Sequence, residues 1–153
     1  MGLDVSHDAF HGAYSAFNRF RQFICAVMGE GNSFPPHFVF TEEGDLERDD
    51  DGRVKYVEGF SEDYFYIVLE DYPRESNPGL YAFLEHSDWD GDISPEMCIK
   101  VADELEALLP AAEQLKWRAD GHIGRDGGYV AVMKRFIAGC RKAAEANEPL
   151  RFG

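Results

Sequence analysis

The chain has 153 residues, of which 44% are hydrophobic and 14% aromatic, so it is long and apolar enough to bury the core of one domain. Its 15 basic and 29 acidic side chains give a net charge of −14, which disfavours direct binding to nucleic acid, because a phosphate backbone needs clustered Lys and Arg. The sequence has neither a run of 18 apolar residues nor the basic-then-apolar order of a signal peptide, so we expect a cytoplasmic protein that does not bind membranes.

The N-terminal region is predicted to contain a strand and a helix. Leu3 and Val5 alternate with polar neighbours, which is typical of a short strand with one buried face. From Phe10 to Met28 the apolar residues recur at helical spacing, and Gly29 is placed to end the helix. The apolar face of this helix comprises Ala13, Ala16, Phe17, Phe20, Phe23, Ile24 and Val27.

The middle of the chain is predicted to supply further strands. Two prolines at 35–36 favour an extended segment before a strand at 38–40, and Asp51-Gly52 is typical of a hairpin turn. The aromatic and β-branched run at 64–69 is the best candidate for a central strand. Residues 42–52 are too acidic to pack, and an acidic hairpin or loop arm is predicted at about 42–63. Within it, residues 42–53 should be exposed and not needed for folding.

The second half is predicted to be mainly helical. Asn77-Pro78 and Ser94-Pro95 each place a capping side chain before a proline, so helices should begin at Pro78 and Pro95. The first should end at Glu85, and a further turn should run from Pro110 to residue 117. Residues 120–128 read as a loop, 129–140 as an amphipathic helix closed near residue 147, and 150–152 as an edge strand beside the N-terminal one.

Together these elements predict one α+β domain spanning residues 1–153, in which several helices pack on a small, mostly antiparallel sheet. Cys25, Cys98 and Cys140 are odd in number, widely spaced and embedded in apolar helical patterns. We therefore expect reduced, buried thiols rather than a disulfide framework.

The segment HSDWDGDISPEM, residues 86–97, has three alternating aspartates around a glycine and resembles a calcium loop. An EF-hand loop needs a bidentate Glu at its twelfth position, and both possible registers place Met97 or Ile99 there. We therefore predict a tight turn anchored by Ile93, followed by a helix that Ser94 caps, rather than a calcium site.

The first helix carries a group of polar residues that could form a binding surface. Arg21 borders the apolar face, where a guanidinium needs a carboxylate or carbonyl partner, and Asp88 is a candidate. An Arg21 side chain that extends past Tyr14 to water is an equal alternative. If Arg21 and Asp88 pair, Tyr14, Ser15 and Asn18 should line the same surface.

Three short stretches resemble a group of short phage, prophage and bacterial proteins without an established activity. They are Met-Gly-Leu-Asp at 1–4, AYSAFNRFR at 13–21 and HSDWDGDISPE at 86–96. In that group the first-helix motif reads approximately Gly-Ser-Tyr-Ser-Gly-Tyr-Asn-x-Trp-Arg, and the later one Phe-Ser-Asp-Cys-Glu-Gly-x-Ile-Gly-Pro-Glu. Trp89 stands where the group often has Cys, which argues against a thiol-based role for this loop. The resemblance implies a shared fold and a phage-type source, but no reaction.

Two functions remain open from the sequence. The leading hypothesis is a non-enzymatic phage-type accessory or interaction protein that uses no cofactor and binds a host protein or a small-molecule ligand. Its surface would comprise His11, Tyr14, Ser15, Asn18, Arg21, His86, Ser87, Asp88 and Asp90. The alternative is a small metal-assisted hydrolase acting on a nucleotide or another phosphate compound. Its metal ligands would be His7, His11, His86, Asp88 and Asp90, although solvated histidines are the simpler interpretation.

Overall fold

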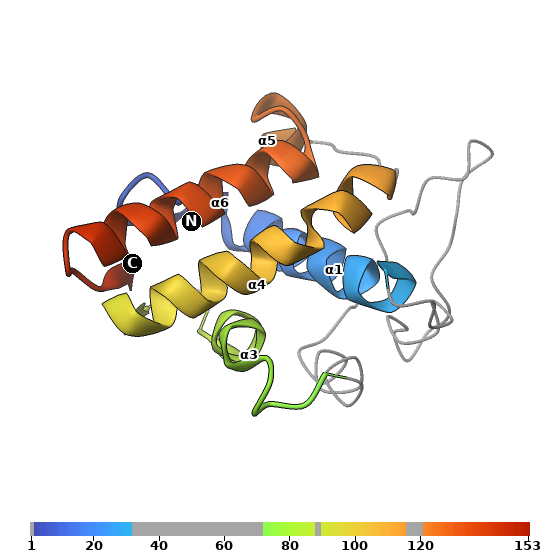
Figure 1. The fold of residues 1–153 in the computed structure, drawn as a ribbon. Helices are drawn as coiled ribbons and strands as arrows, with labels where there is room; N and C mark the ends of the chain where they lie inside the picture. The colour runs from blue at the N-terminus through green and yellow to red at the C-terminus, as the bar shows by residue number, and fades with distance from the viewer. Residues whose placement is uncertain (1, 32–71, 88–89, 116–120) are drawn as a thin grey trace.

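The computed structural model describes residues 2–31, 72–87, 90–115 and 121–153, which form five helices packed against a four-stranded antiparallel sheet (Figure 1). The predicted α+β class is therefore confirmed. The predictions of strands at 38–40 and 64–69, of the arm at 42–63 and of a turn reaching residue 117 fall outside the described residues, wholly or in part. Within the described ranges, no helix is both long and apolar enough to cross a membrane.

The sheet has the strand order β2-β1-β4-β3. β1 (Gly2–Val5) pairs with β2 (Phe10–Ala13), and β4 (Leu150–Phe152) lies between β1 and β3 (Gly91–Ile93). The C-terminal strand does lie beside the N-terminal one, but it is an interior strand and not the predicted edge, because β3 covers its other side. Leu3 and Val5 are buried, as their alternation predicts.

Residues 10–13 were expected to be helical but form β2, so the predicted start of the first helix is wrong. A tight turn at Ser6–Ala9 reverses the chain: Ala9 N–H donates to Ser6 O at 3.2 Å, and His7 and Asp8 have φ values of 58° and 59°. Two consecutive left-handed residues are the signature of a type I′ hairpin turn, which directs the next segment back along β1. Phe10 and Ala13 fit both the spacing of a helix and the alternation of a strand, so the apolar pattern alone could not decide between these two structures.

Helix α1 (Tyr14–Gly31) runs through the interior of the described structure and continues two residues past Gly29, where its end was expected. Every residue from Phe23 to Met28 is buried, so this part of α1 is enclosed on all sides rather than amphipathic. Figure 1 shows α4 (Pro95–Gln114) crossing α1, with α6 (Tyr129–Glu145) alongside α4 and α3 (Pro78–Glu85) against it.

The core is built around Phe17 of α1. Five aromatic rings lie with centroids 5.1 to 6.2 Å from that of Phe17, and they come from two strands and three helices. They belong to Phe10, Phe20, Phe83, Phe136 and Phe152. This cluster joins the sheet to the helices, since no element contributes more than two of the rings.

The helices end largely as predicted, with two corrections. α4 runs through Pro110, where a new turn was expected to begin, and the expected loop at 120–128 contains a short helix, α5 (Gly121–Arg125). α6 closes with Asn147 in the left-handed region at φ 54°. Glu148 N–H donates to Ala143 O at 2.9 Å and Asn147 N–H to Ala144 O at 3.0 Å, the pattern of a Schellman cap.

The beginning of α3 is held by α4. The carboxylate of Glu104 accepts hydrogen bonds from the backbone N–H groups of Gly79 at 2.8 Å and Leu80 at 3.1 Å. Asn77 was expected to cap this helix, but its side chain donates to Pro73 O instead. The two helices approach so closely that a Cβ on Gly79 would lie 2.5 Å from the Lys100 carbonyl group, so glycine is needed there.

Replacing Glu104 with Ala is expected to lower the free energy of unfolding by about 1–2 kcal/mol, because two N–H groups of α3 lose their acceptor. Denaturant unfolding measures this loss, and hydrogen exchange should show faster exchange at Gly79 and Leu80. Glu113→Ala is the matched control, since Glu113 is exposed and forms an exposed ion pair with Lys134 at 3.6 Å. Equal losses in both variants would contradict the capping role.

Candidate functional site

Arg21 connects α1 to the segment that follows α3. Its Nη1 donates to Leu84 O at 3.2 Å and to His86 O at 2.6 Å, and its Nη2 donates to Asn18 Oδ1 at 2.7 Å. The guanidinium also lies 4.9 Å from the ring centroid of Phe17. Carbonyls at a helix C-terminus carry the negative end of the helix dipole, so they are suitable partners for this cation.

The position of Arg21 differs from the expectation that its side chain extends past Tyr14 to water. It was expected at the rim of the apolar face, but its side chain is fully buried. Backbone carbonyls are among its acceptors, and the predicted pair with Asp88 stays a prediction. Asp88 lies outside the described residues. The two sequence motifs therefore meet through the backbone of His86.

His86 holds the segment between α3 and β3 in place. Its Nδ1 lies 2.8 Å from Ser87 O, its Nε2 lies 3.2 Å from Asp92 O, and its ring packs 4.1 Å from that of Phe152. Gly91, at φ 98°, passes close to the imidazole, and a Cβ there would lie 3.3 Å from the ring. The predicted tight turn is thus partly a strand, since residues 91–93 form β3.

Beyond β3, the predicted start of α4 is confirmed. Ile93 is buried, and Ser94 Oγ accepts a hydrogen bond from Met97 N–H at 3.2 Å. Pro95 occupies the first turn of the helix, where its missing N–H costs nothing. The side chain of Met97, in the same turn, is half-buried and faces the outer surface of α3.

A groove of about 580 Å³ opens between the outer face of α3 and the beginning of α4, and we call it the α3–α4 groove. Its apolar lining is supplied by Pro78, Tyr81, Ala82, Ile93 and Met97. Its polar lining is supplied by Arg74, Glu85, His86, Asp92 and Ser94. Apolar walls with a few polar groups are typical of ligand and peptide sites.

Arg74 lines this groove and is held there by two contacts. Its Nη1 lies 2.8 Å from Glu85 Oε1, and its guanidinium stacks 4.2 Å from the ring centroid of Tyr81. The charge of Arg74 is therefore largely offset by Glu85, and its planar group extends the aromatic surface of Tyr81.

The residues predicted to form a binding surface fall into separate places. Asn18, Arg21 and His86 are joined by hydrogen bonds. Tyr14 is half-buried at the first position of α1, and Ser15 beside it is exposed. Ser87 and Asp90 flank the undescribed pair 88–89. His11 belongs to β2 and contacts other partners.

Most of the groove residues were missed by the sequence interpretation. The signal was available in α3, where residues 80–84 read Leu-Tyr-Ala-Phe-Leu without a polar break. When a short helix is apolar on both faces, one face packs on the core and the other remains as apolar surface, which is typical of a binding site. Leu80, Phe83 and Leu84 face the core, whereas Tyr81 and Ala82 line the groove.

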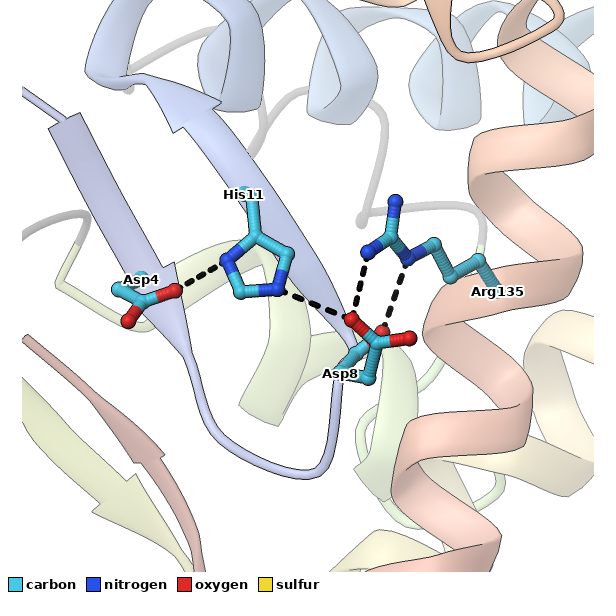
Figure 2. A network of polar contacts seen from close by, with 4 residues as sticks. All are labelled: Asp4, Asp8, His11 and Arg135. Atoms are coloured by element: carbon cyan, nitrogen blue, oxygen red, sulfur yellow. Dashed lines mark hydrogen bonds and ion pairs between the residues drawn. The ribbon is translucent and has the colours of Figure 1, made fainter.

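A second polar cluster lies on the hairpin of β1 and β2. His11 lies between Asp4 and Asp8, and Arg135 reaches Asp8 from α6 (Figure 2). His11 Nε2 is 3.0 Å from Asp8 Oδ1, and Arg135 donates to the carboxylate at 2.6 Å and to the backbone O of Asp8 at 3.0 Å. The cluster fastens the turn to α6.

The histidines proposed as alternative metal ligands contact different partners. His7 lies 2.8 Å from Ser6 Oγ and 3.3 Å from Glu148 Oε1, whereas His11 contacts two aspartates and His86 contacts backbone carbonyls. Across the part of the chain that the structure describes, no group of three His, Cys, Asp or Glu side chains is arranged to hold a metal ion.

The three cysteines are buried, as predicted, and their thiols are free. Burial raises the pKa of Cys25. A hydrogen bond with Cys98, together with burial, raises the pKa of Cys140. Both effects keep the thiols of Cys25 and Cys140 protonated, whereas the hydrogen bond with Cys140 lowers the pKa of Cys98. All three side chains pack in the core.

The Asp8 carboxyl is expected to titrate below its usual range, because the hydrogen bond from Arg135 lowers its pKa and His11 acts in the same direction. Its stabilising effect should therefore be present at neutral pH and be lost as the pH falls through this lowered pKa. NMR titration of the Asp8 carboxyl carbon measures the midpoint, and Arg135→Leu should raise it. Arg141→Leu is the control, because Arg141 contacts Asp103 and Glu106 and should leave the midpoint unchanged.

The chain is an α+β protein with an open, mainly apolar groove between two helices. Comparison with known proteins adds no identification, since no family model, curated protein or solved structure matches the chain.

Proposed function

We propose that this protein is a non-enzymatic interaction protein of the phage-accessory type, which binds a host protein or a small ligand through the α3–α4 groove. The observation that carries the proposal is the groove itself, about 580 Å³ in volume, with five apolar side chains among its lining residues. When a partner covers such a surface and removes it from water, the complex is stabilised by about 25 cal/mol for each Å² of buried apolar area.

The polar groups of the groove support binding rather than catalysis. Both ring nitrogens of His86 face backbone carbonyls, and the hydroxyl of Ser94 caps α4. A general base or a nucleophile needs a reactive atom directed at the substrate. In the described part of the groove, the histidine and the serine instead stabilise the backbone around it.

The groove is also pre-organised at the end where His86 lies. Arg21 fixes the His86 carbonyl from the interior, while the imidazole spans from Ser87 to Asp92. A binding surface held by such contacts loses less conformational entropy when a partner docks. The two sequence motifs, around Arg21 and around His86, thus fix the position of a residue that lines the groove.

The test is capture of partners from a bacterial host lysate, with identification of the proteins and small molecules that co-purify. Ala82→Trp fills the groove, whereas the control Ala138→Trp adds the same side chain on the exposed side of α6. The proposal expects a partner that binds the wild type and Ala138→Trp but not Ala82→Trp. Thermal unfolding of each variant verifies that it is folded. Equal binding by both variants would place the interaction elsewhere and refute the groove as the site.

A further inference from the structure

One edge of the α3–α4 groove is formed by an acidic segment, residues 90–97, which leads from β3 into α4 and which we call the acidic wall. Asp92 lines the groove, and Asp90 and Glu96 lie beside it on the same segment. All three carboxylates are exposed, and the segment contains neither Lys nor Arg. No other residue in the described ranges forms an ion pair with any of these three carboxylates. Arg74, the cation that lines the groove, is already paired with Glu85.

Next to this wall lies the apolar floor of the groove. Pro78, Tyr81, Ala82 and Met97 are each half-buried, so each keeps part of its apolar surface in contact with water. The outer face of α3 and the first turn of α4 therefore offer room for an apolar side chain within reach of the acidic wall. An occupant that matches both features needs an apolar group and a positive charge beside it.

We propose that the α3–α4 groove binds a segment of a partner protein in which an aliphatic or aromatic side chain is flanked by Lys or Arg. This inference rests on the proposed function and specifies the chemistry of its partner. The apolar side chain lies on the floor formed by Tyr81, Ala82 and Met97, and the cations lie against the acidic wall, where Asp92 lines the groove. Asp90 and Glu96 are exposed neighbours on the same segment.

Electrostatics favours a basic segment over the other charge types. The whole chain carries −14, so a basic partner is drawn toward it at long range, whereas an acidic peptide is repelled. The groove is already formed before binding, because α3 packs against α4 and His86 contacts the Asp92 carbonyl. The partner's basic segment therefore orders on a preformed surface. Affinity should fall as salt screens the wall.

The test uses three synthetic peptides. The first is Lys-Leu-Arg-Phe-Lys, the second replaces its cations with Glu, and the third replaces its apolar residues with Ser. Titration of ¹⁵N-labelled protein followed by NMR gives both the affinity and the residues affected. The proposal expects the first peptide to bind at least about tenfold more tightly than either of the others. Its shift changes should centre on residues 78–82 and 92–97.

Two variants test the wall and the floor separately. Asp90→Asn with Asp92→Asn should weaken the first peptide about fivefold or more and reduce its salt dependence. Ala82→Trp should abolish binding. Glu145→Gln is the control. It removes the charge of an exposed carboxylate on α6, which does not line the α3–α4 groove, and should leave the affinity unchanged.

The outcomes separate this inference from the function on which it rests. Equal binding of the basic and acidic peptides, no binding of any peptide, or shift changes away from the groove would each overturn the inference. If a captured partner still depends on Ala82, the proposed function stands while this partner chemistry fails. If a captured partner ignores Ala82→Trp, the proposed function fails as well.

Discussion

Phe17→Ala is expected to lower the free energy of unfolding by about 3–5 kcal/mol. Phe17 is fully buried, and its ring is surrounded by five others that come from β2, β4, α1, α3 and α6. Truncation removes the contacts of the whole ring at the point where the sheet meets the helices. The rings around it are fixed by their own elements, so the cavity cannot collapse completely.

Denaturant unfolding followed by circular dichroism measures this loss. Ile99→Ala is the matched control, because Ile99 is a large apolar residue that is 49% exposed on α4. It should cost less than about 1 kcal/mol, since surface substitutions have small effects. If the two truncations cost the same, Phe17 is not the centre of the core and the aromatic cluster is wrongly placed.

Arg21→Met is expected to lower the free energy of unfolding by about 3 kcal/mol. Methionine preserves most of the apolar stem, but the carbonyl groups of Leu84 and His86 and the side chain of Asn18 lose their donor. Buried acceptors without a partner each cost about 1–3 kcal/mol, and Met has no N–H group to offer them. The variant should also loosen the segment around His86, which links α3 to β3.

Arg141→Met is the control for this prediction. Arg141 makes ion pairs with Asp103 at 3.1 Å and Glu106 at 2.5 Å, but these carboxylates are 62% and 58% exposed. Exposed pairs are worth at most about 1 kcal/mol, so the loss should be much smaller. NMR adds a second readout, because only Arg21→Met should shift the signals of His86 and Ser87. Unchanged signals of His86 and Ser87 in Arg21→Met would contradict the prediction that Arg21 fixes the segment around His86.

Local sequence signals predicted several elements with accurate bounds. Helix α3 begins at Pro78 and ends at Glu85, and α4 begins at Pro95 behind the Ser94 cap. These starts follow from prolines, which limit helix bounds whatever surrounds them. The alternation of Leu3 and Val5 and the spacing within α6 were equally informative, because each face has one environment in the fold.

Other features depended on neighbours that are distant in sequence. Glu104, twenty-five residues along the chain from Gly79, caps α3 in place of Asn77. The position of Arg21 follows the same rule, because its carbonyl acceptors belong to residues more than sixty positions away. A motif in sequence shows that an arginine needs a partner, but only the packing of α3 against α1 selects which atoms serve.

The contrast between residues 10–13, which form β2, and the helix α1 that follows them shows what the sequence decided and what the tertiary structure decided. Apolar spacing by itself determined that Phe17, Phe20 and Ile24 would be buried, since a helix of that pattern has one face to hide. It could not determine that Phe10 to Ala13 would leave the helix, because Phe10 is buried in either conformation. The left-handed turn at His7 and Asp8 and the pairing with β1 decided that. The α3–α4 groove is likewise a tertiary property: its walls are separate in the sequence and become a site only when α3, β3 and α4 pack together.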